Sequence, residues 1–258
     1  MIIFIIFVLA SILLGIGVML APALSTQQPQ VGIATTLALA LVIGGGTLWA
    51  RWVQWDTLVI DYLVFGLVSL VVLGGTMVQA GADDTPGRLH RDDWLFFALL
   101  AALSVGLAFF PLSDNDQTAL TLINSITSDE QLTFPNIETL SIGSHVLTAY
   151  LSQQLNQDVT LVYRAVLSVL SFLLALLAHD FSMIYTGRYG GRIIATGTIL
   201  AVMIGTWIGL ITLILTALLF GITSVVFLIR ARRYRRWQDV LALFITTVAW
   251  IITSPFNL

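Results

Sequence analysis

The chain has 258 residues, 58% of them hydrophobic and 10% charged, with a mean hydropathy of +0.96 and a formal net charge of -3. Soluble domains are about half apolar, so this composition indicates an integral membrane protein, and the sparse positive charge argues against a nucleic-acid partner. The absence of cysteine excludes disulfides, thiolate nucleophiles and metal centres held by cysteine.

Apolar runs long enough to span a bilayer recur along the chain, since a spanning helix needs about 20 mostly apolar residues. Residues 192–229 are too many for one crossing, because a helix rises about 1.5 Å per residue and the hydrocarbon core is about 30 Å thick. We divide this stretch into two helices at residues 205–209. The sequence therefore predicts an all-α, polytopic transmembrane bundle of about eight spans. The other six predicted spans are residues 2–21, 31–52, 57–78, 94–111, 161–178 and 240–253.

The first span ends in the small residues Ala-Pro-Ala-Leu-Ser, which a signal peptidase could cleave. Its beginning, MIIFIIF, lacks the positive charge of a signal peptide, and its apolar run is longer than usual for one. We therefore expect a retained membrane helix.

The arginine positions predict the orientation of the helices, because arginines concentrate in cytoplasmic loops. Most of them face the cytoplasm only if the loop of residues 112–160 lies outside. We therefore expect a multi-pass protein of the cell membrane, surrounded by the lipid bilayer. The arginines placed inside are Arg88, Arg91, Arg188, Arg192 and the run from Arg230 to Arg236.

The polar segment of residues 111–163 is where a function is to be sought, since it carries six of the 14 acidic residues and no arginine. Its run Ser-Asp-Asn-Asp, residues 113–116, can cap a helix, because Ser and Asp oxygens accept hydrogen bonds from free backbone amides. Apolar residues at helical spacing then predict two surface helices, over residues 117–128 and 137–155. Their apolar stripes are Ala119, Leu122, Ile123 and Ile126 in the first, and Leu140, Leu147, Leu151 and Leu155 in the second.

Asp116 is the candidate general base of this segment, with Asp114 as the second carboxylate. Asp116 follows a span and precedes a surface helix, at the mouth of a membrane cavity, where a carboxylate can take a proton from an attacking hydroxyl. A helix cap is the structural alternative for both residues. The three histidines form no metal-ligand motif, and each is expected to be interfacial or hydrogen-bonded.

The order of these features resembles the membrane glycosyltransferases of the GT-C type, which include protein mannosyltransferases and lipid A aminoarabinose transferases. In that family a spanning helix ends in an acidic motif, and a large outer loop with surface helices precedes a re-entering helix that opens with an arginine. The resemblance covers about residues 109–255 and rests on order and topology. The matching residues are Asp116-Gln117, Phe134-Pro135, Gly143-Ser144-His145, the run from Tyr163 to Ser168, and HDFSMIYTGRYGGR from His179 to Arg192.

The resemblance implies transfer of a sugar from a polyprenyl-phosphate donor to an acceptor on the outer face of the membrane. Asp116 and Asp114 would then be the catalytic carboxylates. Stabilising the leaving phosphate calls for a cation, and His145 and Arg164 are the outward candidates for binding it. The resemblance implies no cofactor, and the residues do not decide whether a divalent metal takes part.

Two departures from the family pattern affect this hypothesis. Gln117 stands at the second acidic position, so a two-carboxylate arrangement would need Asp114. The chain also resembles only the N-terminal half of such an enzyme, so that a C-terminal half or a partner membrane subunit would supply further groups. We accordingly divide the chain into extra N-terminal helices, residues 1–93, and a GT-C-like module, residues 94–258.

Two other function classes stay open at this point. A non-catalytic membrane subunit would use the helices to pack against a partner, with the outer loop capping the complex. A transporter is less favoured, because charge within the spans is sparse and Asp61 is its main candidate.

Overall fold

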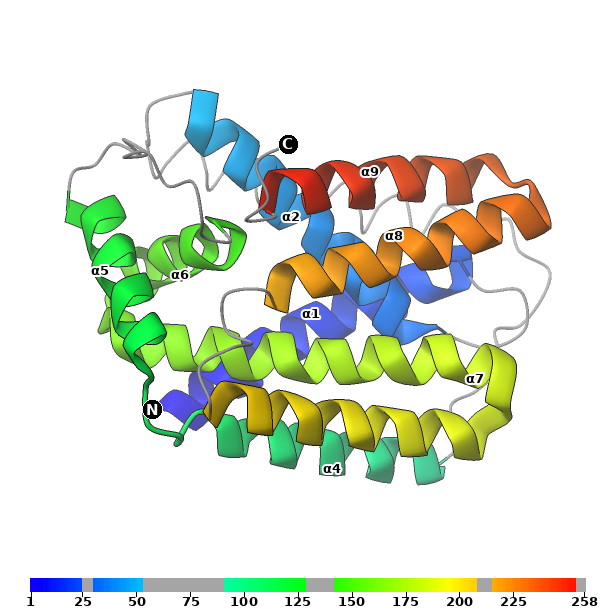
Figure 1. Cartoon of the computed structure of the whole chain (residues 1–258), viewed down its shortest axis with the longest axis horizontal. Coiled ribbons are helices and arrows are strands. Elements are labelled where there is room, and N and C mark those ends of the chain that lie inside the picture. Colours follow the sequence, from blue (N-terminus) through cyan, green and yellow to red (C-terminus); the bar gives the residue numbers. More distant parts are fainter. Residues whose placement is uncertain (25–29, 53–90, 129–141, 208–214, 254–258) are drawn as a thin grey trace.

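The computed structural model describes residues 1–24, 30–52, 91–128, 142–207 and 215–253. These residues are almost entirely helical, and no strand occurs among them (Figure 1). The all-α prediction is therefore confirmed for this part of the chain. Its helices are α1 (Ile2–Leu24), α2 (Val31–Trp52), α4 (Arg91–Leu107), α5 (Asp114–Ser128), α6 (Ile142–Leu155), α7 (Val159–Trp207), α8 (Leu215–Tyr234) and α9 (Trp237–Thr253).

The helices lie where the apolar runs predict them. Helix α2 has the predicted bounds, and α7 ends at Trp207, inside the division placed in the long apolar stretch. The span predicted at residues 57–78 and its Asp61 lie outside the described residues. Of the described helices, α7 and α8 are long and apolar enough to cross a membrane. An eight-span arrangement stays a prediction.

Helix α7 consists of two antiparallel halves, residues 159–186 and 188–207, which run back along each other in Figure 1. The reversal occurs at Gly187, whose φ of 71° is readily adopted only by a residue without a Cβ. In the first half, every residue from Val162 to Leu177 except Arg164 is buried. A helix that is apolar and buried all round forms the interior of a bundle, and this half of α7 does so here.

Helix α2 packs against α1, α7 and α9, and one hydrophobic core includes residues from the N-terminal helices as well as from the rest of the described chain. Gly32 is required at the contact with α7, because a Cβ there would lie 2.6 Å from the backbone carbonyl of Leu176. This glycine lets the two helix backbones approach closely, as small residues do in membrane bundles.

Hydroxyl groups buried between the helices donate to their own helix. Thr35 donates to the carbonyl of Val31 and Ser171 to that of Leu167, each at 2.7 Å. Thr223 makes the same bond four residues back. Such bonds satisfy a polar group inside a helix bundle without a water molecule.

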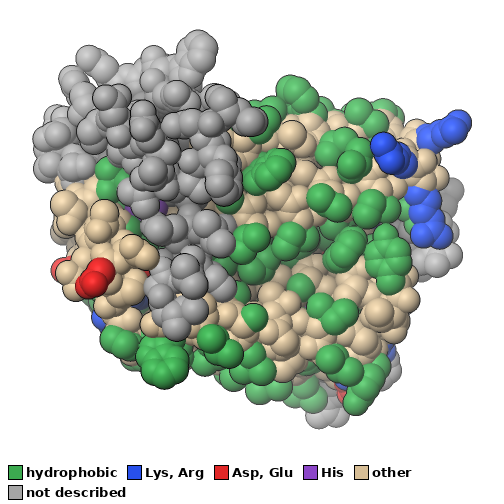
Figure 2. Space-filling model, in the orientation of Figure 1, with side chains coloured by type: hydrophobic (Ala, Val, Ile, Leu, Met, Phe, Trp, Pro, Cys, Tyr) green, Lys and Arg blue, Asp and Glu red, His purple; other side chains and the backbone are tan. Residues whose placement is uncertain are grey.

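Large apolar side chains are exposed on the surface of the same bundle (Figure 2). Soluble monomers rarely expose contiguous apolar patches of more than a few hundred Å². Together with the self-satisfied hydroxyls, this exposure is typical of a surface that faces lipid. Exposed examples are Leu95 and Leu99 on α4, Ile204 and Trp207 on α7, and Phe244 on α9.

The two predicted surface helices are present as α5 and α6, which pack against each other and against α7. In α5 the predicted face is correct, since Ala119 and Ile123 are fully buried. In α6 the predicted stripe is only partly buried: Leu147 and Leu151 pack against the core and Leu155 is 42% exposed, whereas Ser144 and Thr148 are buried. That this stripe lies on the membrane stays a prediction. The polar face of α6 is tolerated inside because the Thr148 hydroxyl donates to the Ser144 carbonyl at 2.7 Å. Residues 129–141 lie outside the described part.

Candidate functional site

The first residues of α5 form a reciprocal cap. The Asp116 carboxylate Oδ2 accepts hydrogen bonds from the Ser113 amide at 2.8 Å and from the Ser113 hydroxyl at 2.7 Å. The Asp116 amide in turn donates to the Ser113 Oγ at 3.3 Å. This pattern is a capping box with Asp in place of Glu, so the capping predicted for this run is confirmed.

The other oxygen of Asp116 joins α5 to the start of α7. The Tyr163 hydroxyl donates to Asp116 Oδ1 at 2.8 Å, and both side chains are buried, at 2% and 1% exposure. Both carboxylate oxygens therefore have partners, and all of these partners are neutral groups. Asp116 thus fixes the junction of the first surface helix with the re-entering helix.

Arg164 follows Tyr163 and is the one residue of the buried stretch of α7 that is not fully buried. Its Nη1 donates to the Ala108 carbonyl, just past the end of α4, at a long 3.4 Å. Its Nε is buried and has no hydrogen-bond partner among the described residues. A guanidinium with an unpartnered donor is suited to hold an anion, and this one follows directly after the tyrosine that binds Asp116. We call Ser113, Asp116, Tyr163 and Arg164 the acidic corner.

The remaining predicted site residues lie apart from this contact. Asp114 is exposed on the first turn of α5, where a carboxylate favours the positive end of the helix. His145 is buried on α6, at 1% exposure. The hydrogen bonds of Asp116 go to Ser113 and Tyr163, so neither Asp114 nor His145 shares its oxygens. The two-carboxylate arrangement stays a prediction.

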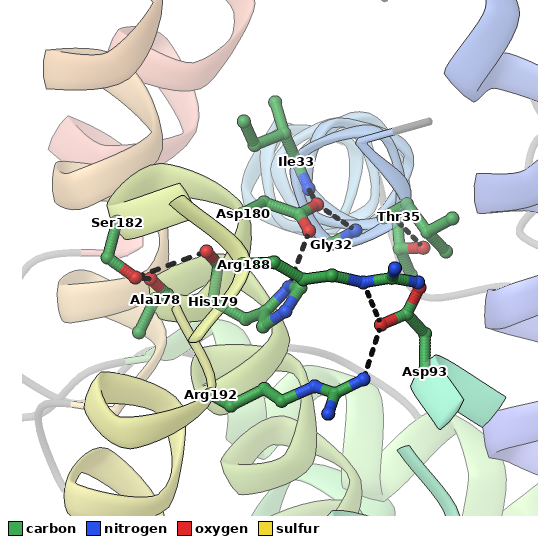
Figure 3. Close-up of polar contacts among 11 residues, drawn as sticks. Gly32, Ile33, Thr35, Asp93, Ala178, His179, Asp180, Ser182, Arg188 and Arg192 are labelled. Atoms are coloured by element: carbon green, nitrogen blue, oxygen red, sulfur yellow. Dashed lines mark hydrogen bonds and ion pairs between the residues drawn. The ribbon is translucent and has the colours of Figure 1, made fainter. Parts of the chain in front are cut away.

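A second polar group lies near the reversal in α7 and is not evident from the sequence (Figure 3). Asp93 of α4 is 6% exposed and binds two arginines of α7. Arg188 approaches it with two nitrogens, with Nε at 2.8 Å from Oδ1, and Arg192 Nη2 is 3.0 Å from the same oxygen. The sequence signal is the spacing of four residues between the arginines, which places both on one helix face.

Asp180 lies beside this ion pair and caps a different helix (Figure 3). Its Oδ2 accepts hydrogen bonds from the amides of Gly32 at 2.7 Å and Ile33 at 3.3 Å, at the start of α2. Its Oδ1 is 3.2 Å from Nδ1 of His179, so the expectation of a hydrogen-bonded histidine is correct there. Free amides at a helix start need an acceptor, which explains a carboxyl side chain at this depth. We call Asp93, His179, Asp180, Arg188 and Arg192 the turn cluster.

The described residues contain no group of three or more His, Asp or Glu side chains placed to hold a metal ion. No protein-family model matches the chain, and no curated protein or solved structure matches it either. The acidic corner and the turn cluster therefore have to be interpreted from their own geometry.

Proposed function

We propose that this protein is a multi-pass membrane transferase of the GT-C type that moves a sugar from a polyprenyl-phosphate donor to an acceptor at the outer face. Arg164 carries this proposal, because its Nε is buried without a partner, one residue after the tyrosine that binds Asp116 and at the start of α7. The order α4, surface helices α5 and α6, then α7 opening with Tyr163 and Arg164 supports the same assignment.

In this proposal Arg164 binds the phosphate of the donor, and Asp116 receives the acceptor. An acceptor hydroxyl replaces the Tyr163 hydroxyl on Asp116 Oδ1 and gives its proton to the carboxylate. Its oxygen forms the new bond to the anomeric carbon of the sugar, while the bond from that carbon to the phosphate oxygen breaks. The polyprenyl phosphate leaves with the electron pair, and its charge is stabilised by the guanidinium.

The first experiment compares Asp116→Asn with Asp114→Asn in membranes supplied with a polyprenyl-phosphate sugar. General-base assistance contributes about 10²- to 10⁴-fold, so transfer should fall by that factor in Asp116→Asn and change little in Asp114→Asn, whose carboxylate is exposed. Thermal unfolding of both variants controls for misfolding. Unchanged transfer by a folded Asp116→Asn would overturn the catalytic role.

The second experiment tests the phosphate role of Arg164. Arg164→Leu should insert normally and lose protection by the donor against heat, because the guanidinium supplies the charge-assisted hydrogen bonds to phosphate. Arg164→Lys, which keeps a positive charge, is the matched variant and should retain part of the protection. Equal protection of the wild type and Arg164→Leu would assign Arg164 to a structural contact with Ala108.

A third experiment tests the orientation of the helices in the membrane. Because the chain has no cysteine, a single introduced thiol can be labelled without background. Ser128→Cys and Gln238→Cys each introduce one thiol, the first at the end of α5 and the second at the start of α9. On intact cells, an impermeant reagent should label only Ser128→Cys if the arginine-rich side is cytoplasmic. Labelling of Gln238→Cys alone would reverse the orientation and remove the outer-face assignment.

A second candidate function is that of a non-catalytic membrane subunit. It is favoured by the burial of Asp116, whose two oxygens are both occupied within the chain. On this alternative the carboxylate only pins α5 to α7. Both Asp116→Asn and Arg164→Leu would then reduce stability and assembly. The purified complex would contain less of the partner, but the turnover of each assembled complex would be normal.

A further inference from the structure

We propose that α7, α8 and α9 together form a binding site for one anionic glycerophospholipid, with an acyl chain in an apolar groove and the phosphate at the arginines around the end of α8. The inference depends on the membrane embedding of the chain and not on sugar transfer. The site has two parts, the groove and the arginines, which adjoin each other at Phe181.

The groove has a volume of about 660 Å³ and no charged side chain in its wall. This volume falls within the range of about 300 to 1,000 Å³ found for ligand sites. Ser224, one of its few polar residues, has its hydroxyl committed to the Phe220 carbonyl at 2.8 Å. The groove therefore offers mainly hydrocarbon contact. Its wall includes Phe181 of α7, Gly221, Val225 and Leu228 of α8, and Leu243 and Trp250 of α9.

Gly221 allows the Trp250 indole to lie close to α8 in the groove wall. A Cβ at this position would lie 3.3 Å from Nε1 of Trp250, a tight contact. Val225, one turn further along α8, is 51% exposed. Because a helix brings residues four apart onto one face, these positions form a continuous apolar stripe between α8 and α9.

The positive charge lies at the end of α8, where the run of arginines joins α8 to α9. Arg230 is buried and neutralised, with Nε 2.8 Å from Asp239 Oδ1. The following arginines are exposed, and no carboxylate of the described residues pairs with them. Within the described part of the chain they therefore present a positive surface without acidic partners, which Figure 2 shows at the right-hand end of the bundle. The four exposed arginines are Arg232, Arg233, Arg235 and Arg236.

The groove and the arginines meet at Phe181. This ring lines the groove and also lines a small pocket whose wall contains Arg230 and Arg233. Trp237 at this end is 71% exposed, and exposed tryptophans concentrate at membrane interfaces. The site therefore places hydrocarbon along the bundle and phosphate at the interface, in the arrangement of a bilayer lipid. Charge complementarity selects an anionic headgroup.

The test uses the full chain in detergent with dioleoylphosphatidylglycerol, dioleoylphosphatidylcholine as the lipid without net charge, and glycerophosphoglycerol as the headgroup without acyl chains. Bound lipid is counted by native mass spectrometry, and affinity is taken from titration. The wild type should retain one phosphatidylglycerol and prefer it to phosphatidylcholine. Glycerophosphoglycerol should not compete, because the acyl chain supplies the apolar contact.

Four variants separate the two parts of the site. Arg233→Gln should weaken phosphatidylglycerol about fivefold and leave phosphatidylcholine unchanged, since one interfacial charge is removed. Val225→Trp should fill the groove and weaken both lipids. The matched controls are Arg235→Gln, outside the pocket, and Leu241→Trp, which is 48% exposed on α9 but outside the groove.

Three outcomes would overturn the proposal. Equal affinity for the two lipids would show that the arginines do not select the anionic headgroup. Equal losses of phosphatidylglycerol affinity in Arg233→Gln and Arg235→Gln would mean diffuse electrostatic attraction without a defined site. Lipid-independent crosslinking between two copies, abolished by Val225→Trp, would assign the groove to a protein contact. Asp116→Asn should bind lipid as the wild type does, so a failure of the transferase proposal is distinguishable from a failure of this one.

Discussion

The acidic corner and the turn cluster both bury a carboxylate between helices, but they stabilise it differently. In the corner, Asp116 has neutral partners only, and the nearby Arg164 donates elsewhere. In the turn cluster, Asp93 is bound by two guanidinium groups, and Asp180 accepts from two helix amides. Buried charge that is neutralised within the chain serves the fold. Each group contains a buried arginine Nε without a partner, but Arg192 is already paired with Asp93, whereas Arg164 pairs with no carboxylate of the described residues. The corner is therefore the one of the two whose arginine keeps its positive charge for another anion.

The largest effect on stability is expected from Asp180→Ala. The amides of Gly32 and Ile33 would lose their acceptor inside the protein, and each unsatisfied buried group costs about 1 to 3 kcal/mol. We expect a loss of about 3 kcal/mol, measured by denaturant unfolding in detergent followed by circular dichroism. Asp180→Asn, which keeps one carbonyl oxygen, should lose less. Equal losses in both variants would show that charge, and not the accepting oxygen, stabilises the start of α2.

Asp93→Ala should destabilise the fold by about 2 kcal/mol. Breaking a fully buried pair costs about 3 to 5 kcal/mol, and the value is reduced here because the arginine side chains are 45% and 28% exposed. The neighbouring Asp92→Ala, at an exposed position, is the control and should change stability much less. The same unfolding measurement applies. A larger loss in Asp92→Ala would contradict the assignment of the ion pair.

Tyr163→Phe should cost about 1 kcal/mol, because it removes one hydrogen bond to Asp116 Oδ1 and keeps the buried ring. The capping box to Ser113 stays intact, so α5 should remain helical. Thermal unfolding and helix content by circular dichroism measure the two properties. If this variant lost as much stability as Asp93→Ala, the contrast between the corner and the turn cluster would fail.

The smallest change is expected at Asp158, which caps the start of α7 next to the corner. Its Oδ1 accepts from the Thr160 amide at 2.7 Å, and the residue is exposed. Asp158→Ala should cost about 0.5 to 1 kcal/mol. Asp158→Ser, which preserves a capping oxygen, should recover most of that stability in the same assay. No recovery would mean that the charge of Asp158 acts beyond the cap.

The helices could be predicted from the sequence, because apolar runs and local caps are local signals. The bounds of α2 and the end of α7 at Trp207 follow from the length of the apolar stretches alone. The cap by Ser113 and Asp116 is likewise a pattern of three-residue spacing. For α6 the apolar periodicity could not show that Thr148 enters the interior, because its hydroxyl is accommodated there by donating to its own helix.

The long-range contacts could not be predicted. The Tyr163 partner of Asp116 is 47 residues away, and the Asp180 partner of Gly32 is 148 residues away. Nothing in single-residue spacing distinguishes Asp180, which caps a distant helix, from a carboxylate in a polar turn. The four-residue spacing of Arg188 and Arg192 predicts that both lie on one helix face. It does not indicate that Asp93 is the acid that they bind.

The cap that Asp180 places on α2 also has a consequence for synthesis. Chains are made at about 5 to 20 residues per second, so the 148 residues between Gly32 and Asp180 correspond to roughly 7 to 30 s of translation. During that interval the start of α2 lacks the acceptor that it has in the folded chain. The start of α2 therefore gains this cap only after α7 has been made, so the N-terminal end of the bundle is completed late although it is made first.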